Sequence, residues 1–321
     1  MNDMITDAAP GVLIAICTFR RPELAQTLAS MRDLKPCGLP VAIAVADNDT
    51  SPSAQDLVTG IAADHPLPLT YLHAPSANIS IARNALLDHA RATGARLLIY
   101  VDDDQIANPN WLRSLTQAWS SQSVGAILAP VHATYPPEAP SWMVRARPHD
   151  NLPVTDHKGS IKSGYTGNSL MDLGDPAWQG LRFDLARGRS GGEDTALFAE
   201  YMAAGGCIGF AADAILNEPV PADRAKLSWL LRRRYRMGQT HASILAHRAE
   251  TGGRLKAAGL ASAKALACGA MALGRAADPA RRNPQLMRAA LHAGAVAQLM
   301  GARQIELYGT TPGLTHNPKG N

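Results

Sequence analysis

The residues best suited to chemistry in this sequence are three consecutive acids, Asp102, Asp103 and Asp104. They follow the apolar run 97–101, which has the length of a short buried strand. Ligands collect at the carboxyl ends of such strands in open α/β folds. Three adjacent like charges repel one another unless a cation or hydrogen-bond donors offset the repulsion. The triplet therefore predicts a divalent-metal site, with a solvated acidic turn or a helix cap as the alternative.

Further polar clusters follow other predicted strands. The apolar runs 11–17 and 41–46 each precede polar residues and then a helix-like stretch. This alternation is typical of βα units and of a mostly parallel sheet, so we expect the clusters to meet at one sheet edge. The clusters are Thr18, Phe19, Arg20 and Arg21; Asp47, Asn48 and Asp49; Arg83 and Asn84; and, after a glycine loop, Glu193 and Asp194.

Each cluster also has an ordinary structural explanation. The residues after the first strand could form a plain connection to the next helix. Asp47 and Asp49 could start a turn before Pro52, because Asp and Asn favour turns. Arg83 could be an exposed helix residue, and Glu193 with its neighbour could be first-turn acids that offset a helix dipole.

The periodic pattern extends over most of the chain. Helices are predicted over 22–32, 52–64, 80–92, 109–121 and 193–203, and strands over 69–73, 124–129, 164–171 and, as the last strand, 207–212. The stretch 130–163 is rich in Pro and His and has no clear period. We expect it to be a long irregular connection near the site, since such loops are often functional.

Composition fits a folded protein in a reducing compartment. Of 321 residues, 46% are hydrophobic and 18% charged, which excludes wholesale disorder. The four cysteines lack metal-ligand spacing and read as core thiols. Residues 1–10 lack the charged start of a secretory signal. These features predict a cytoplasmic protein.

The charge is concentrated near the carboxyl end. Residues 226–303 hold fourteen Lys or Arg and two acids, a net +12, against −8 for the remainder. The Ala-rich segments 265–274 and 289–302 are shorter than the roughly 20 residues of a membrane span. They predict helices that pack on the domain or lie in a membrane interface. Because clustered Lys and Arg are attracted to anionic lipids, we expect peripheral attachment to the inner face of the cytoplasmic membrane.

The order of the motifs resembles a known family. Cys-Thr-Phe-Arg-Arg-Pro, Asp-Asn-Asp, Ala-Arg-Asn, Asp-Asp-Asp and Gly-Glu-Asp occur in the order seen in family 2 glycosyltransferases of the GT-A fold. The similarity is closest to the bacterial exopolysaccharide (succinoglycan-type) glucosyltransferases and spans about 11–238. It implies an α/β GT-A fold with a mostly parallel central sheet flanked by helices and a helical basic C-terminal extension. The expected division is an N-terminal arm (1–10), a catalytic domain (11–225), a helical basic region (226–309) and a flexible tail (310–321).

The resemblance also implies roles for the donor-side residues. Thr18, Phe19 and Arg20 would line the nucleotide pocket. Asp47 or Asp49, together with Arg83, would contact the uracil. Asp102 would reach the ribose, with Asp103 beside it in the nucleotide site. Asp104, with Asp102, would hold Mn²⁺ or Mg²⁺, which can bridge diphosphate oxygens.

On the acceptor side, the resemblance implies that Asp194 is the general base and that Glu193 holds the acceptor or orients Asp194. The residues implied near the acceptor or the diphosphate are Asn168, Trp229, Arg232, Arg233 and Arg236, although the arginines could equally form a solvated basic face. Relatives often carry a His after the last core strand, where this chain has Asn217, Glu218 and Pro219. That departure leaves the third metal ligand open.

The function implied is an inverting, metal-dependent transfer of glucose from UDP-glucose to a lipid-linked oligosaccharide. A nucleotidyltransferase that makes a sugar nucleotide is one alternative, although no Gly-rich phosphate loop follows the first strand. A non-catalytic nucleotide or carbohydrate binder is another. Nucleic acid is not expected as a partner, because the arginines have few interleaved aromatic residues.

Overall fold

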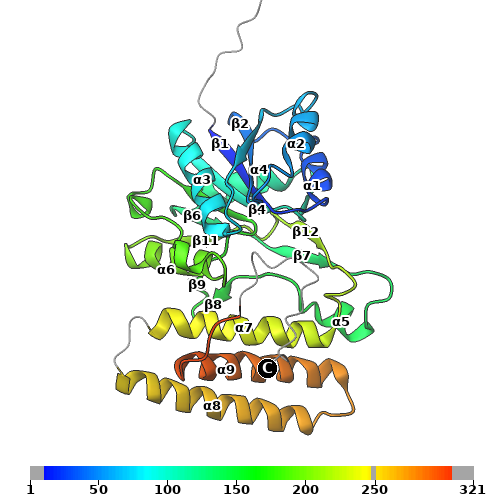
Figure 1. Cartoon of the computed structure of the whole chain (residues 1–321), viewed down its shortest axis with the longest axis vertical. Coiled ribbons are helices and arrows are strands. Elements are labelled where there is room, and N and C mark those ends of the chain that lie inside the picture. Colours follow the sequence, from blue (N-terminus) through cyan, green and yellow to red (C-terminus); the bar gives the residue numbers. More distant parts are fainter. Residues whose placement is uncertain (1–10, 247–250, 306–321) are drawn as a thin grey trace, which may run out of the picture.

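The computed structural model describes residues 11–246 and 251–305. A seven-stranded sheet with helices on both faces forms one part of the molecule, and three long helices form a separate layer beside it (Figure 1). The arm predicted for 1–10 and the tail predicted for 310–321 lie outside the described residues.

The central sheet is mostly parallel, as predicted. Its strand order is β11-β6-β10-β4-β1-β2-β3, and β10 runs antiparallel to both of its neighbours. The strands are β1 (Val12–Thr18), β2 (Val41–Asp47), β3 (Leu69–His73), β4 (Leu97–Asp102), β6 (Ala126–Leu128), β10 (Ser169–Asp172) and β11 (Ile208–Phe210).

Helices cover both faces of this sheet, which explains why the strand sequences are almost continuously apolar. Along β1, Val12, Ile14 and Ile16 pack in the core beneath α1 (Leu24–Ser30), α2 (Gln55–Ala62) and α4 (Trp111–Ser121). Leu13 and Ala15 point to the opposite core, beneath α3 (Ile79–Ala92) and α6 (Glu193–Ala203). Two short 3-10 helices, η1 (Pro176–Trp178) and η2 (Leu185–Arg187), border the second core.

The segment after β6 is more ordered than the sequence suggested. The stretch expected to be irregular contains β7 (Val131–Thr134), α5 (Ser141–Ala146), β8 (Val154–Thr155) and β9 (Ile161–Ser163). The strand predicted from residue 164 begins only at Ser169, in β10. β7 pairs with the distant β12, and β8 pairs with β9. These elements are too short to show a periodic pattern in the sequence.

The sequence analysis also missed a late strand. The prediction that 207–212 is the last strand was wrong, because β12 (Leu216–Pro219) follows it. β12 lies between β5 (Ile106–Ala107) and β7 in a three-stranded sheet. Its sequence, Leu-Asn-Glu-Pro, lacks an apolar run. The pairing partners, rather than the composition, make it a strand.

The helical layer consists of α7 (Leu227–Ala246), α8 (Thr251–Leu273) and α9 (Pro279–Leu299). α9 packs against both other helices, and α8 is the outermost of the three (Figure 1). The segments 265–274 and 289–302 were predicted as short helices, but they belong to longer ones. Among residues 11–246 and 251–305, no helix combines the length and the apolar character that a membrane span requires.

Glycine brings α7 and α9 into backbone contact. A Cβ at Gly294 would lie 1.8 Å from the carbonyl oxygen of Tyr235, and one at Gly238 would lie 1.9 Å from that of Leu291. Both distances are far below van der Waals contact. The two glycines therefore set the spacing of these helices.

The prediction of core thiols holds only in part. All four cysteines are free, and Cys268 is buried. Cys17 and Cys37 are half-buried, whereas Cys207 is exposed. The apolar run 207–212 suggested that Cys207 is buried in a strand. The strand β11 spans only Ile208–Phe210, so Cys207 lies outside it.

Candidate active site

The predicted clusters meet at the carboxyl edge of the sheet. In the parallel pairing of β1 and β2, Thr18 is opposite Asp47, and in the pairing of β1 and β4, Cys17 is opposite Asp102. The three strands therefore end at the same level. The polar residues that follow them lie side by side, as the sequence predicted.

The acidic triplet separates into three environments. Asp103 turns inward, where its Oδ2 accepts a 2.8 Å hydrogen bond from the Thr18 hydroxyl. Asp104 accepts a 2.6 Å hydrogen bond from Nη2 of Arg21. The Asp102 side chain is 48% exposed, and its Oδ1 lies 4.0 Å from Nη2 of Arg83. Of the three, Asp102 is the acid most open to a ligand.

The protein environment raises the pKa of two of these acids. For Asp103, burial raises the pKa to about 7, opposed by Arg21 and reinforced by the charge of Asp104. For Asp102, desolvation by the surrounding protein raises the pKa to about 6, opposed by Arg83. The charges of Asp104 and Asp194 raise it further. Asp194 on α6 and the triplet on β4 therefore belong to one electrostatic site.

A buried ion pair joins α3 to α6. The guanidinium of Arg83 donates to Oε1 of Glu193, and both side chains are less than a tenth exposed. Oε2 of Glu193 is buried without a hydrogen-bond partner. Burial raises the pKa of Glu193, while Arg83 opposes the rise. Arg83 thus lies between the acid of β4 and the first acid of α6.

The start of α6 is set by two glycines. Gly191 and Gly192 have φ of 82° and 89°, a left-handed conformation that glycine adopts without strain. The helix begins at the next residue, so Glu193 and Asp194 occupy its first turn. Glu193 points into the protein, whereas the half-buried Asp194 accepts a 2.6 Å hydrogen bond from the backbone N–H of Thr195.

The acids after β2 serve the local fold. Asp47 is fully buried and accepts hydrogen bonds from the backbone of Ala54 and from the Tyr71 hydroxyl. Asp49 forms a bidentate pair with Arg20 at 2.7 and 2.9 Å. The hydrogen bond from Arg20 holds the pKa of Asp49 well below its usual range. The Arg20 guanidinium also lies 5.3 Å from the ring centre of Phe19.

The Asn168 side chain lies in the core behind the site. Its side chain is fully buried, and its Oδ1 accepts a 2.9 Å hydrogen bond from the Trp111 indole. Its Nδ2 donates to the carbonyl oxygens of Pro130 and Ala214. The Asn168 amide therefore ties β10 to its surroundings, and its hydrogen bonds are made within the protein, whereas its neighbour Gly167 lies against the Asp102 carboxylate.

The basic residues of α7 take different positions. Arg236 donates a 3.2 Å hydrogen bond to the Ser190 carbonyl and lowers the pKa of Glu193, so it lies beside the start of α6. Arg233 lies 5.4 Å from the ring centre of Trp229, which also stacks on His149. Arg232 is exposed. The structure thus brings Arg236 to the site and packs Trp229 into an aromatic cluster beside it.

Two further residues of the site were not among the predicted site residues. Arg21 contacts Asp103 and Asp104. Burial raises the pKa of Glu218 on β12, and the nearby charges of Asp104 and Asp102 raise it further. Both stand in motifs noticed in the sequence, where Arg21 follows Arg20 and Glu218 replaces the expected His. Only the pairing of β12 with β7 shows that Glu218 reaches this edge.

The acids offer few ligands for a metal. Across 11–246 and 251–305, no group of three or more His, Cys, Asp and Glu side chains is arranged to hold a metal ion. Mg²⁺, however, is commonly bound by one or two carboxylates together with substrate phosphates. Asp102 and Asp104, two residues apart at the end of β4, supply hard oxygen donors of that kind. Their chemistry fits a divalent cation bound together with a diphosphate.

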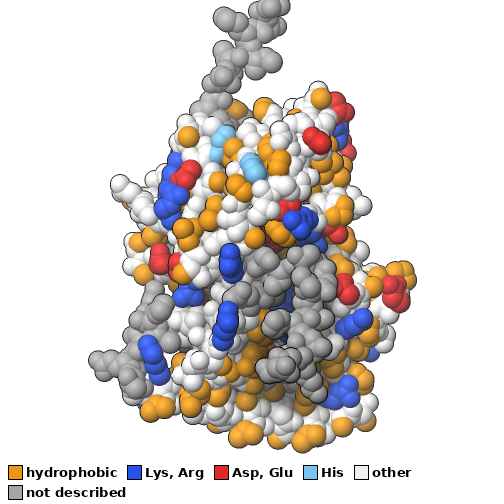
Figure 2. Space-filling model, viewed as in Figure 1, with side chains coloured by type: hydrophobic (Ala, Val, Ile, Leu, Met, Phe, Trp, Pro, Cys, Tyr) orange, Lys and Arg blue, Asp and Glu red, His pale blue; other side chains and the backbone are white. Residues whose placement is uncertain are grey.

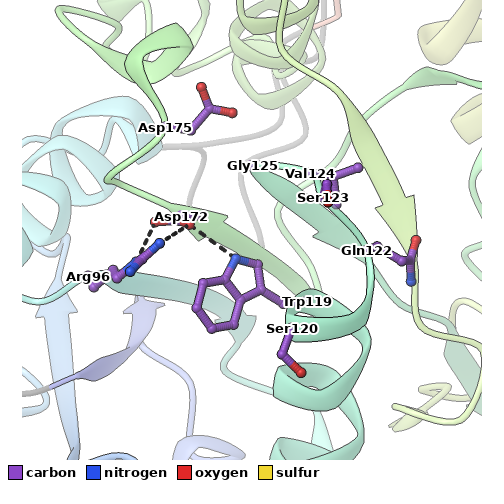
Figure 3. A pocket seen from close by; sticks show the side chains of 9 residues that line it. All are labelled: Arg96, Trp119, Ser120, Gln122, Ser123, Val124, Gly125, Asp172 and Asp175. Carbon is purple, nitrogen blue, oxygen red and sulfur yellow. Dashed lines mark hydrogen bonds and ion pairs between the residues drawn. The ribbon is translucent and has the colours of Figure 1, made fainter.

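A pocket lies at the opposite edge of the sheet, away from these acids. Arg96, which precedes β4, and Asp172, which ends β10, form an ion pair in it at 3.1 Å (Figure 3). Trp119 donates a hydrogen bond to the same carboxylate. Because these polar groups bind one another, we do not assign a ligand to this pocket.

The chain belongs to glycosyl transferase family 2, whose profile matches residues 13–177. It is 43% identical, over 297 residues, to the succinoglycan biosynthesis protein ExoM of Rhizobium meliloti (strain 1021). That alignment covers 92% of this chain and 95% of the relative. The protein is therefore a glycosyltransferase, and the resemblance inferred from the motifs is confirmed.

Solved structures confirm the GT-A fold. A mannosyltransferase of Pyrobaculum calidifontis, in complex with GDP-Man and Mn²⁺, superposes with a TM-score of 0.59 at 19% identity. The match covers 90% of this chain and 87% of that one. S. aureus TarS 1-349 in complex with UDP-GlcNAc gives a TM-score of 0.52 at 11% identity, covering 91% and 92% of the two chains. At these identities the likeness concerns the fold alone.

Proposed function

We propose that this protein transfers a sugar from a nucleotide-diphosphate donor to a lipid-linked saccharide, with inversion at the anomeric carbon, during assembly of a succinoglycan-type exopolysaccharide. The observation that carries this proposal is that Arg83 joins the acid at the end of β4, Asp102, to the start of α6, where Asp194 lies in the first turn. Glucose from UDP-glucose is the proposed donor. The 43% identity to a succinoglycan biosynthesis protein supports the pathway.

On the donor side, the half-exposed Asp102 is placed to accept hydrogen bonds from the ribose, and Arg20 and Arg83 border the nucleotide. Asp104 and Asp102 would hold Mn²⁺ or Mg²⁺, which when bound offsets the charge of the departing diphosphate. The solved relative that carries Mn²⁺ and a nucleotide sugar supports this choice of cofactor. Arg21, which now neutralises Asp104, would then be released toward the diphosphate.

On the acceptor side, Asp194 takes the proton of the acceptor hydroxyl as that oxygen attacks the anomeric carbon. The bond from this carbon to the diphosphate oxygen breaks in the same step, and its electrons leave with the nucleoside diphosphate. One base suffices for such a displacement. The Arg83–Glu193 pair holds the start of α6 against α3 and so fixes the position of Asp194. Arg236 adds positive charge on the side where the diphosphate departs.

Membranes that carry the lipid-linked acceptor test the reaction. They would be incubated with a panel of labelled UDP- and GDP-sugars, with Mn²⁺, with Mg²⁺ or with a chelator. We expect transfer from UDP-glucose that depends on the metal. Asp104→Ala should weaken metal-dependent UDP binding in calorimetry, whereas Asp213→Ala, an exposed acid before β12, should not. Nucleotide binding without transfer from any donor would instead indicate a non-catalytic binder.

We also propose that the protein attaches to the inner face of the cytoplasmic membrane. A lipid-linked acceptor is confined to a membrane, and residues 226–303 carry a net +12. Clustered Lys and Arg favour anionic lipid surfaces. Sedimentation of the protein with vesicles of neutral and anionic phospholipid measures this attachment, and equal binding to both would contradict an electrostatic cause.

A further inference from the structure

The outermost helix has its large and small apolar residues in an unusual arrangement. Ala258, Ala261 and Ala272 of α8 are buried against α9. Leu255, Leu266 and Leu273 are 64%, 75% and 80% exposed. A surface helix of a soluble domain normally turns its large apolar residues toward the core and polar residues outward. α8 does the reverse.

The exposed leucines form a continuous stripe. They are eleven and seven residues apart, which is about three and two helical turns, so they lie along one side of α8. Leu260, which is 58% exposed, and Met271, which is 42% exposed, lie on the other flank of the outward side of α8, more than a quarter turn around the helix from the stripe. Figure 2 shows apolar side chains along the edge of the molecule that α8 forms in Figure 1.

The charges around this face have one sign. Within 251–273 there are three basic residues, Arg254, Lys256 and Lys264, and no acid. Over 251–305 the count is eight Lys or Arg against the single acid Asp278. An exposed apolar side on a helix whose charges are all basic is typical of a helix that lies in the interface of an anionic membrane.

We propose that the outward face of α8 is the surface that inserts into an anionic phospholipid bilayer. The leucine stripe would enter the boundary between headgroups and acyl chains, while Lys256 and Lys264 remain at the headgroup level and bind phosphate. A second copy of the chain fits this face less well, because two such faces would bring like charges together. The proposal deepens the membrane attachment in the proposed function by naming its surface.

Flotation of the full chain with vesicles tests the proposal. Phosphatidylcholine vesicles with and without phosphatidylglycerol would be compared. We expect binding to the anionic vesicles and at least about a tenfold loss in Leu266→Glu/Leu273→Glu, since two apolar side chains would leave the bilayer and two acids would face it. Leu39→Glu is the matched control. Leu39 is 38% exposed and lies just before the amino end of β2, on the sheet domain rather than on the helical layer. It should bind like the wild type.

The basic residues are tested separately. Lys256→Gln/Lys264→Gln should weaken binding to anionic vesicles by about fivefold for each lysine, with little change on neutral vesicles. Absence of wild-type binding to anionic vesicles, or unchanged binding of the leucine variant, would overturn the proposal. A wild-type dimer in sedimentation that the leucine variant dissociates would assign the face to a second copy instead.

These outcomes are separable from those of the proposed reaction. Vesicle binding is measured without a sugar donor, and UDP binding in calorimetry is measured without vesicles. The leucine variant should retain the thermal midpoint and the UDP affinity of the wild type, since its changed side chains are exposed and lie on the outermost layer. Loss of vesicle binding with intact UDP binding is therefore the supporting result.

Discussion

The carboxyl edge of the sheet and the outer face of α8 depart from the usual distribution of residues in opposite directions. At the sheet edge, the acids Asp103 and Glu193 are buried, and each accepts a hydrogen bond from a neighbouring side chain. On α8, large apolar groups such as Leu266 are exposed beside lysines. Buried charge and exposed apolar surface are both uncommon. We propose a ligand for each, a nucleotide sugar at the sheet edge and a membrane surface at α8.

The largest effect is expected from removing the base at the sheet edge. Asp194→Asn should lower turnover by about 10² to 10⁴-fold, the usual contribution of a general base, and leave UDP affinity nearly unchanged. Glu200→Gln on the same helix is the control, because Glu200 is exposed. Initial-rate assays with labelled donor measure the effect. Normal turnover in the Asn variant would remove Asp194 from the mechanism.

The next prediction compares the loss of stability when a buried ion pair is broken with the loss when an exposed one is broken. Arg83→Gln leaves Glu193 buried without its partner and should lower the free energy of unfolding by about 3 to 5 kcal/mol. Arg182→Gln breaks the pair with Asp88, whose two side chains are about half exposed, and should cost about 0 to 1 kcal/mol. Urea denaturation measures both. Equal losses would show that burial does not distinguish the two pairs.

Two glycines of the helical layer allow a comparison of a packed position with an open one. Gly294→Ala forces α9 away from the backbone of Tyr235 and should destabilise the protein by about 1 to 3 kcal/mol. Gly259→Ala on α8 meets no atom within 4 Å and should stabilise it by up to about 1 kcal/mol, because Ala is the better helix former. Thermal unfolding gives both signs. A loss at both positions would contradict an open outer face.

The smallest effect concerns the acid after β2. Because Arg20 lowers the pKa of Asp49 in the folded state, its contribution to stability is present above the unfolded pKa of about 3.9 and is lost as the pH falls through the folded value. Stability of the wild type should therefore decline below about pH 4 more steeply than that of Asp49→Asn. Unfolding curves across this range test it, and parallel curves would exclude the linkage.

Much of the fold could be predicted because it is encoded locally. The apolar runs gave β1 to β4 within a residue or two, and α6 matched its predicted range. The strand β12, with the sequence Leu-Asn-Glu-Pro, was not predicted, because its stability comes from pairing with strands that are distant in the sequence. Only part of α8 was predicted. Its alanines and leucines do not form an apolar face in the sequence pattern, and the packing of α9 decides which side of the helix is buried.

The site was predictable in its composition but not in its arrangement. The motifs identified the acids and their order along the chain. The burial of Asn168 was not predictable, because an asparagine next to a glycine carries no sign of whether its amide faces a ligand or the core. Glu218 was not predicted as a site residue, because only the pairing of β12 with β7 brings it near the triplet.

The sequence by itself determined the family, the parallel strands and the presence of acids at their ends, since these follow from short-range patterns of apolar and polar residues. The tertiary structure decided which side chain each acid contacts and how exposed it is. Asp103 is held by Thr18, Asp104 by Arg21, and Asp102 is left open, and these contacts join residues about 80 positions apart. β4 ends at Asp102 and the chain turns at the next two residues, so the three adjacent acids point in different directions and meet different partners.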